Sequence, residues 1–131
     1  MDTNFKLAFA GLAGVLIGAT SITTLSAQGV SPTKAAPGYL IAEVEVIDPE
    51  GYKTYQDATR PALTATGGRF LVRGGKTIAL DGEPPKRIIV LAFDSMEKAL
   101  EYRNSTAYKE AVPIRDKSSK FRLFAAEGVA P

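Results

Sequence analysis

Two arginines four residues apart, Arg69 and Arg73, are the residues whose spacing most directly suggests chemistry. They are the first and last residues of the segment RFLVR, which is rich in residues that favour β-strands. Alternate residues of a regular strand point to the same face, so both guanidinium groups are expected on one face of a sheet. Such a pair could bind a carboxylate through two-point hydrogen bonds. The structural alternative is that both arginines form ion pairs with Glu43, Glu45 or a carboxylate of a partner subunit.

Residue types that the chain lacks narrow its chemistry further. It contains no Cys, His or Trp. Catalysis by a nucleophile that an imidazole activates is therefore excluded. Zinc or copper sites are not expected, because their usual ligands are absent. A Tyr or a carboxylate would have to serve as any general acid or base. No metal and no cofactor are expected. The net charge of +2 also gives no reason to expect a nucleic acid partner.

The N-terminus has the pattern of an export signal. Lys6 precedes the uncharged run LAFAGLAGVLIGA, which is followed by small and polar residues that end at Ala27. We expect residues 1–27 to be a signal peptide that is cleaved after Ala27, which places the protein outside the cytoplasm, in the periplasm or secreted. The alternative is an uncleaved membrane anchor, since uncharged residues continue to Gln28. Residues 28–37 are expected to be a disordered leader.

The sequence from Gly38 onward alternates strand and helix patterns. Strand patterns cover residues 38–47, 69–73, 86–93 and 120–127, and a short segment, 76–80, continues or pairs with the second of them. Helical patterns cover residues 49–66, 95–104 and, less regularly, 105–117. Asp48 is the expected N-cap of the first helix, with Pro49 at its first position. We expect a kink or break at Pro61 and an interruption at Pro113.

This order, β-α-β-β-α-β, predicts an α+β fold of the ferredoxin-like type over residues 38–128. Right-handed crossovers would form one four-stranded antiparallel sheet with the helices on one face. The other face would expose apolar residues unless a second copy of the chain covered it. A homodimer is therefore expected.

Four stretches of the sequence are similar to one known family. They are GYLIAEVEVIDPEGYKTY, GGRFLVRGG, PPKRIIVLAFDSMEKALEYRNSTAY and FRLFAAEG. Together they resemble the family called domain of unknown function 1330, which is similar to the dimeric α/β-barrel superfamily. The resemblance covers residues 38–128, and it implies ferredoxin-like units that pair sheet to sheet. Tyr102 stands where the family often has Trp, and Thr106 where it often has Pro.

Four more residues are candidates for ligand contact in such a barrel. Arg87 begins a hydrophobic strand, and Tyr102, Asn104 and Arg115 belong to the second helical region, near the mouth of the expected barrel. The aromatic residues are also typical of an ordinary core. A solvated charge is the ordinary interpretation of Arg87. With Arg69 and Arg73, these residues form the predicted ligand-binding set.

Three functions remain open at this point. The first is a dimeric binder of a small anionic or aromatic molecule. The second, which the superfamily resemblance implies, is a cofactor-independent enzyme such as a monooxygenase or an isomerase. The third is a structural or stress-related dimer without a ligand. A membrane partner is expected only if the signal segment stays uncleaved.

We predict that the protein isolated from the cell envelope begins at Gln28, because the small residue Ala27 suits signal peptidase. N-terminal sequencing measures this directly. A protein in the membrane fraction that still begins at Met1 would contradict cleavage and support the anchor.

Overall fold

The computed structural model describes residues 11, 14 and 33–131. The predicted signal segment and the first half of the predicted leader lie almost entirely outside these residues. From Gly38 the chain forms β1 (Gly38–Val46), α1 (Pro49–Ala65), β2 (Arg69–Arg73), β3 (Arg87–Phe93), α2 (Met96–Asn104), α3 (Thr106–Ser118) and β4 (Ser119–Glu127). Among the described residues, no helix combines the length and the apolar character needed to cross a membrane.

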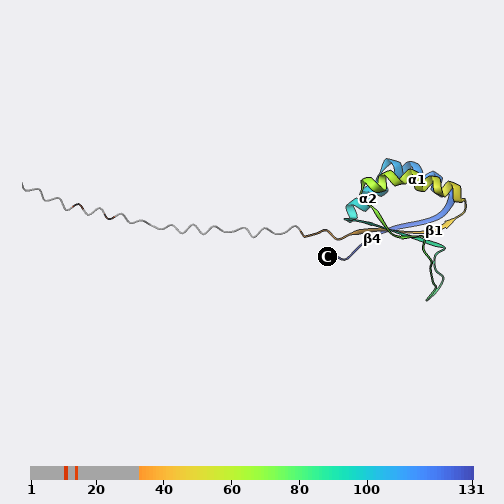
Figure 1. The fold of residues 1–131 in the computed structure, drawn as a ribbon, viewed down its shortest axis with the longest axis horizontal. Coiled ribbons are helices and arrows are strands. Elements are labelled where there is room, and N and C mark those ends of the chain that lie inside the picture. The colour runs from red at the N-terminus through yellow and green to blue at the C-terminus, as the bar shows by residue number, and fades with distance from the viewer. Residues whose placement is uncertain (1–10, 12–13, 15–32) are drawn as a thin grey trace, which may run out of the picture. The chain divides into compact units, whose positions relative to one another are not determined.

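The four strands form one antiparallel sheet in the order β2-β3-β1-β4. The helices cover one face of this sheet (Figure 1). Strands β3 and β1 lie in the centre of the sheet, and they carry its most buried apolar residues. This arrangement is the predicted ferredoxin-like fold, and it places the helix-covered face against the core.

Short side chains fix where the helices begin. Asp48 accepts a hydrogen bond from the backbone N–H of Glu50 (3.1 Å) at the start of α1, and Pro49 follows it in the first turn. Ser95 accepts one from the N–H of Lys98 (3.2 Å) at the start of α2. Each cap satisfies a backbone donor that the helix itself leaves unpaired.

The predicted break at Pro61 and the predicted interruption at Pro113 do not occur. Helix α1 continues through Pro61, and α3 continues through Pro113. Each proline removes one hydrogen bond to the carbonyl four residues earlier, on Asp57 and Lys109 respectively. All four residues are exposed, so water can bind the freed carbonyl groups and the helices persist.

The predicted strand at residues 76–80 is also absent. Residues 74–86 instead form an irregular connection between β2 and β3 that extends from the sheet on the side opposite the helices (Figure 1). Ile78 and Leu80 on this connection are 69% and 90% exposed. The segment has strand-forming residues but no neighbouring strand to pair with, so no ladder of hydrogen bonds forms.

Arg69 and Arg73 do not share a face, contrary to the prediction from their spacing. Arg69 is paired with Ala92, whereas Arg73 is paired with Ile89, and the register shifts between Phe70 and Val72. This irregularity, of the β-bulge kind, inserts one extra residue and reverses the alternation beyond it. Arg73 therefore lies on the helix-covered face and Arg69 on the open face.

The open face of the sheet carries partly exposed apolar side chains. Phe124 on β4 is 42% exposed, and it is paired across the sheet with Ile41. Cross-strand ion pairs flank this patch: Glu43 pairs with Arg122, and Glu45 pairs with Lys120 (3.6 Å). Glu43 and Glu45, which lie on β1, thus form ion pairs with residues of β4. Neither forms an ion pair with Arg69 or Arg73 on β2.

The close approach of β1 to the start of α2 requires a glycine. A Cβ on Gly38 would lie 2.6 Å from the backbone Cα of Met96 and 2.6 Å from the carbonyl oxygen of Ser95. Gly38→Ala should lower the free energy of unfolding by about 1–3 kcal/mol, because the clash is with backbone that cannot rotate away. Denaturant melts measure this effect. Gly75→Ala is the matched control, since its Cβ would meet no atom within 4 Å; an equal loss in both variants would contradict the packing argument.

Candidate functional site

A cavity of about 60 Å³ lies between the helix-covered face of the sheet and the helices. Leu40, Ala42 and Leu91 form part of its floor. It reaches solvent between α1 and β2, where the lining residues Gln56, Arg60, Phe70 and Arg73 are half-buried or exposed. One water needs roughly 10–15 Å³ of such volume, so the enclosed part holds only a few waters. A larger molecule must extend into the opening.

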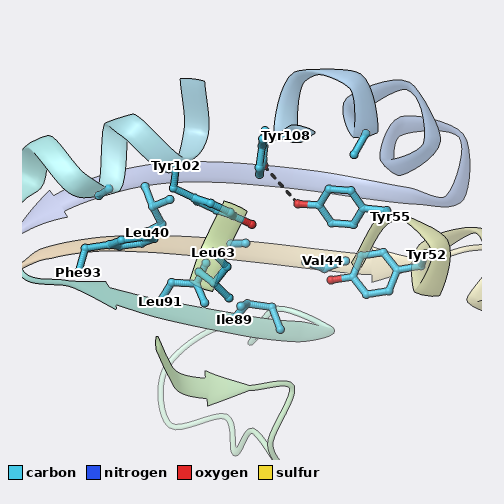
Figure 2. Packing of buried hydrophobic residues seen from close by; sticks show 13 residues of the cluster. Leu40, Val44, Tyr52, Tyr55, Leu63, Ile89, Leu91, Phe93, Tyr102 and Tyr108 are labelled. Carbon is cyan, nitrogen blue, oxygen red and sulfur yellow. Dashed lines mark hydrogen bonds between the residues drawn. The ribbon is translucent and has the colours of Figure 1, made fainter. Parts of the chain in front are cut away.

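Four tyrosines, all at most 6% exposed, surround this cavity: Tyr52, Tyr55, Tyr102 and Tyr108. Figure 2 shows their rings between the helices and the strands. The Tyr102 and Tyr108 rings meet edge to face with their centroids 5.1 Å apart. Such contacts order the rings and make the walls largely aromatic.

A chain of hydrogen bonds links two of these tyrosines to a buried arginine. The Tyr55 hydroxyl donates to the Tyr108 hydroxyl (3.2 Å; dashed line in Figure 2), and Nη1 of Arg115 donates to the same oxygen (3.1 Å). Arg115 is 9% exposed and also pairs with the Asp116 carboxylate through Nη2 (2.8 Å). The Tyr108 hydroxyl therefore accepts two hydrogen bonds, and Arg115 is held in place behind the cavity wall.

Burial raises the pKa of three of these hydroxyls, on Tyr52, Tyr55 and Tyr102, so they stay protonated at neutral pH. It raises the pKa of Tyr102 to about 12, against the opposing effect of the Thr59 hydroxyl. The pKa of Tyr55 is raised by burial and further by Tyr108. Burial also raises the pKa of Tyr52, although the nearby Arg87 guanidinium opposes it. General acid–base catalysis is most effective when the pKa lies near the working pH. These hydroxyls are therefore suited to donate hydrogen bonds and poorly suited to transfer protons.

One arginine, Arg73, lines the open side of the cavity, and a second, Arg87, lies beside the cavity wall at Tyr52. The Arg73 guanidinium stacks over the Phe70 ring, with its carbon 4.5 Å from the ring centroid. The Arg87 guanidinium carbon is 5.9 Å from the centroid of the Tyr52 ring. Neither arginine forms an ion pair with any residue in the described part of the chain.

The structure brings together only part of the predicted ligand-binding set. Arg73 and Tyr102 line the cavity, and Arg87 lies beside it at Tyr52. Arg115 contacts the wall through Tyr108 rather than the cavity itself. Arg69 is on the other face, 3.7 Å from Asp94, and Asn104 is exposed at the end of α2.

Tyr52, Tyr55 and Tyr108 were not in the predicted set, yet they form much of the wall. Tyr52, Tyr55 and Thr59 recur at helical spacing, which indicates a buried face of α1. That periodicity shows that the residues are buried. It does not show that they border a cavity, because this depends on packing against β3, α2 and α3.

The described residues contain no group of three or more Asp or Glu side chains that could hold a metal ion.

The fold has counterparts among solved structures. A protein of unknown function from Rhodopseudomonas palustris is 21% identical with a TM-score of 0.59, over 73% of this chain and 85% of that one. SnoaB, a cofactor-independent oxygenase from Streptomyces nogalater, is 9% identical with a TM-score of 0.50, over 74% of this chain and 97% of that one. A dimeric ferredoxin-like protein of unknown function from Thermobifida fusca is 13% identical with a TM-score of 0.49, over 72% and 92%. For the first two structures, whose TM-scores are 0.59 and 0.50, the likeness shows the fold alone.

No curated protein matches the sequence. The model of one family does match, over residues 37–129, which is most of the chain and includes every strand and helix described above. On the strength of that match, the chain belongs to the family described as Domain of unknown function (DUF1330).

Proposed function

We propose that this is an exported, homodimeric protein that binds a small anionic or aromatic molecule in the cavity between its sheet and its helices. The observation that carries the proposal is the combination in one place of an aromatic wall and unpaired arginines. A small-molecule site is typically a mostly apolar hollow with a few well-placed polar groups. This cavity has that character, with leucines and tyrosines inside and Arg73 at its opening.

The open face of the sheet supports the homodimer. Ile41 and Val90 lie side by side on it, partly exposed, on the two central strands. An isologous pairing would cover both copies of this face at once. The connection at residues 74–86 extends on the same side and carries the exposed Ile78 and Leu80 toward such a partner (Figure 1). The N-terminal sequence pattern supports export.

A cofactor-independent enzyme is the second candidate. The observation in its favour is the hydrogen-bonded chain from Tyr55 through Tyr108 to Arg115, which borders the cavity. Against it stand the raised pKa values of the tyrosines and the absence of any carboxylate among the lining residues. These two features leave no group near the cavity that is ready to accept a proton at neutral pH. Binding without catalysis therefore fits the residues better.

Filling the cavity should abolish binding without unfolding the protein. Ala42 is buried in the floor, so Ala42→Leu would occupy the space that a ligand needs. We expect at least one member of a panel of small aromatic acids, phenols and neutral aromatics to bind the wild type saturably, and to show no binding to Ala42→Leu. Ligand-observed NMR measures both.

The matched control for this experiment is Ala58→Leu, which makes the same change on the exposed side of α1. It should bind as the wild type does. A panel with no binding member, or equal binding by Ala42→Leu, would contradict a ligand site in this cavity. Turnover of a bound panel member would favour the enzyme.

Placing a charge in the open face should dissociate the dimer. Val90→Lys would bury an unpaired ammonium between two sheets, and the dimer should weaken at least about a hundredfold. Light scattering over a range of micromolar concentrations measures the mass. Leu100→Lys is the control, because Leu100 is 45% exposed on α2, away from the open face. A wild type that stays monomeric, or a Val90→Lys variant that stays dimeric, would contradict pairing through this face.

A further inference from the structure

The charge around the cavity is one-sided. Its lining contains two arginines, Arg60 and Arg73, and no Asp or Glu. Arg60 is already neutralised by Asp57 on the same helix (3.0 Å). Arg73 forms no ion pair with any of residues 33–131, and its guanidinium rests on the Phe70 ring. The opening thus presents a positive charge that no neighbouring carboxylate balances.

Arg87 adds a second, better-ordered positive group. Gly74 has a φ of +65°, and a Cβ at this position would lie 2.4 Å from Cζ of Arg87. The missing side chain of Gly74 therefore leaves the space in which the Arg87 guanidinium lies. On its other side, the guanidinium approaches the Tyr52 ring. The group is held between two neighbours instead of extending freely into solvent.

One donor of this guanidinium has no acceptor. Nε of Arg87 is buried, and no hydrogen-bond partner for it exists among the described residues. A buried donor without an acceptor is costly, and native structures rarely leave one. A carboxylate that approaches a guanidinium side-on accepts from Nε and from one Nη at once. In the ligand-free arrangement Nε has almost no exposed surface, so a carboxylate would accept from it only after the Arg87 side chain turns toward the cavity.

The sheet register places the two arginines on the same face of neighbouring strands. Arg73 on β2 is paired with Ile89 on β3, and Arg87 precedes Ile89 by two residues, so all three point to the helix-covered face. Tyr52 lines the cavity together with Arg73 and lies against Arg87. The two guanidinium groups therefore flank the Tyr52 side of the opening. The enclosed space is too small for a whole ligand, so its apolar part would lie inside and its charged part at this opening.

We propose that the ligand is a small aromatic carboxylate, whose ring lies among the cavity tyrosines and whose carboxylate is bound by Arg87 and Arg73. This inference rests on the proposed function, since it requires a ligand in the cavity. It adds the chemical class of the ligand, its orientation and the choice of Arg87 as the main anchor. A guanidinium binds a carboxylate or a phosphate through two hydrogen bonds, so the comparison with phenyl phosphate below decides between these two anions.

The test compares three probes of similar shape on the full dimer: benzoate, benzyl alcohol and phenyl phosphate. Calorimetry should show benzoate as the tightest of the three in the wild type. Arg87→Gln should raise the Kd of benzoate by about 10- to 100-fold, the range expected for a lost charged hydrogen bond, and leave benzyl alcohol within about twofold. Arg73→Lys should give a smaller loss, because it keeps the charge and removes the planar fork.

Arg69→Gln is the matched control. It removes the same charge from the same region of the chain, but on the open face, so light scattering must first show that the variant keeps the mass of the dimer. It should leave the Kd of benzoate within about twofold of the wild type, which separates direct contact from a change in net charge. Retained binding of benzyl alcohol by Arg87→Gln shows in the same experiment that the variant is folded.

The outcomes separate this inference from the proposed function. Equal affinity for benzoate and benzyl alcohol in the wild type, with no effect of Arg87→Gln, would overturn the carboxylate site and leave a cavity that binds neutral molecules. Tighter binding of phenyl phosphate than of benzoate would overturn the choice of carboxylate. Dissociation of the dimer by Arg87→Gln with unchanged benzoate affinity would make Arg87 an ion-pair partner of the second subunit. Binding of none of the three probes would contradict both proposals.

Discussion

The layer between the sheet and the helices has to be apolar, yet four tyrosines bring hydroxyl groups into it. A buried hydroxyl needs a partner, and this requirement organises the interior of the protein. Tyr108 meets it by accepting hydrogen bonds from Tyr55 and from Arg115, which ties α1 to α3. The rings of these four tyrosines line the cavity. The same tyrosines that hold the helices to one another thus border the candidate site.

A binding role follows from the chemical state of these groups. Burial raises the pKa of the Tyr52, Tyr55 and Tyr102 hydroxyls and keeps them neutral, and the lining residues include no carboxylate to act as a base. SnoaB is 9% identical to this chain, and a likeness at that identity shows a shared fold and carries no activity with it. What distinguishes this cavity is Arg73 at its opening together with Arg87, which lies beside the cavity between Gly74 and Tyr52. These residues favour the capture of an anion over the transfer of a proton.

The order of strands and helices could be predicted from the sequence, because alternation, helical spacing and the caps Asp48 and Ser95 are local signals. Features that depend on pairing could not. The irregularity between Phe70 and Val72 has no glycine to mark it, and it moves Arg73 to the face opposite Arg69. Residues 76–80 have the composition of a strand but lack a partner. Of the predicted ligand-binding residues, Arg73 and Tyr102 line the cavity. Tyr52 and Tyr108 border it only through contacts between distant segments, which the sequence does not show.

The central claim is that a small molecule occupies the space between the tyrosines and the two arginines. A crystal structure of the protein grown with saturating benzoate tests it most directly. We expect the benzoate ring inside the cavity against Tyr52 and Tyr102, with its carboxylate within hydrogen-bond distance of Arg87 and Arg73. Benzoate bound outside this cavity, such as between the two sheets of a dimer, or a cavity left empty at saturation, would contradict the claim.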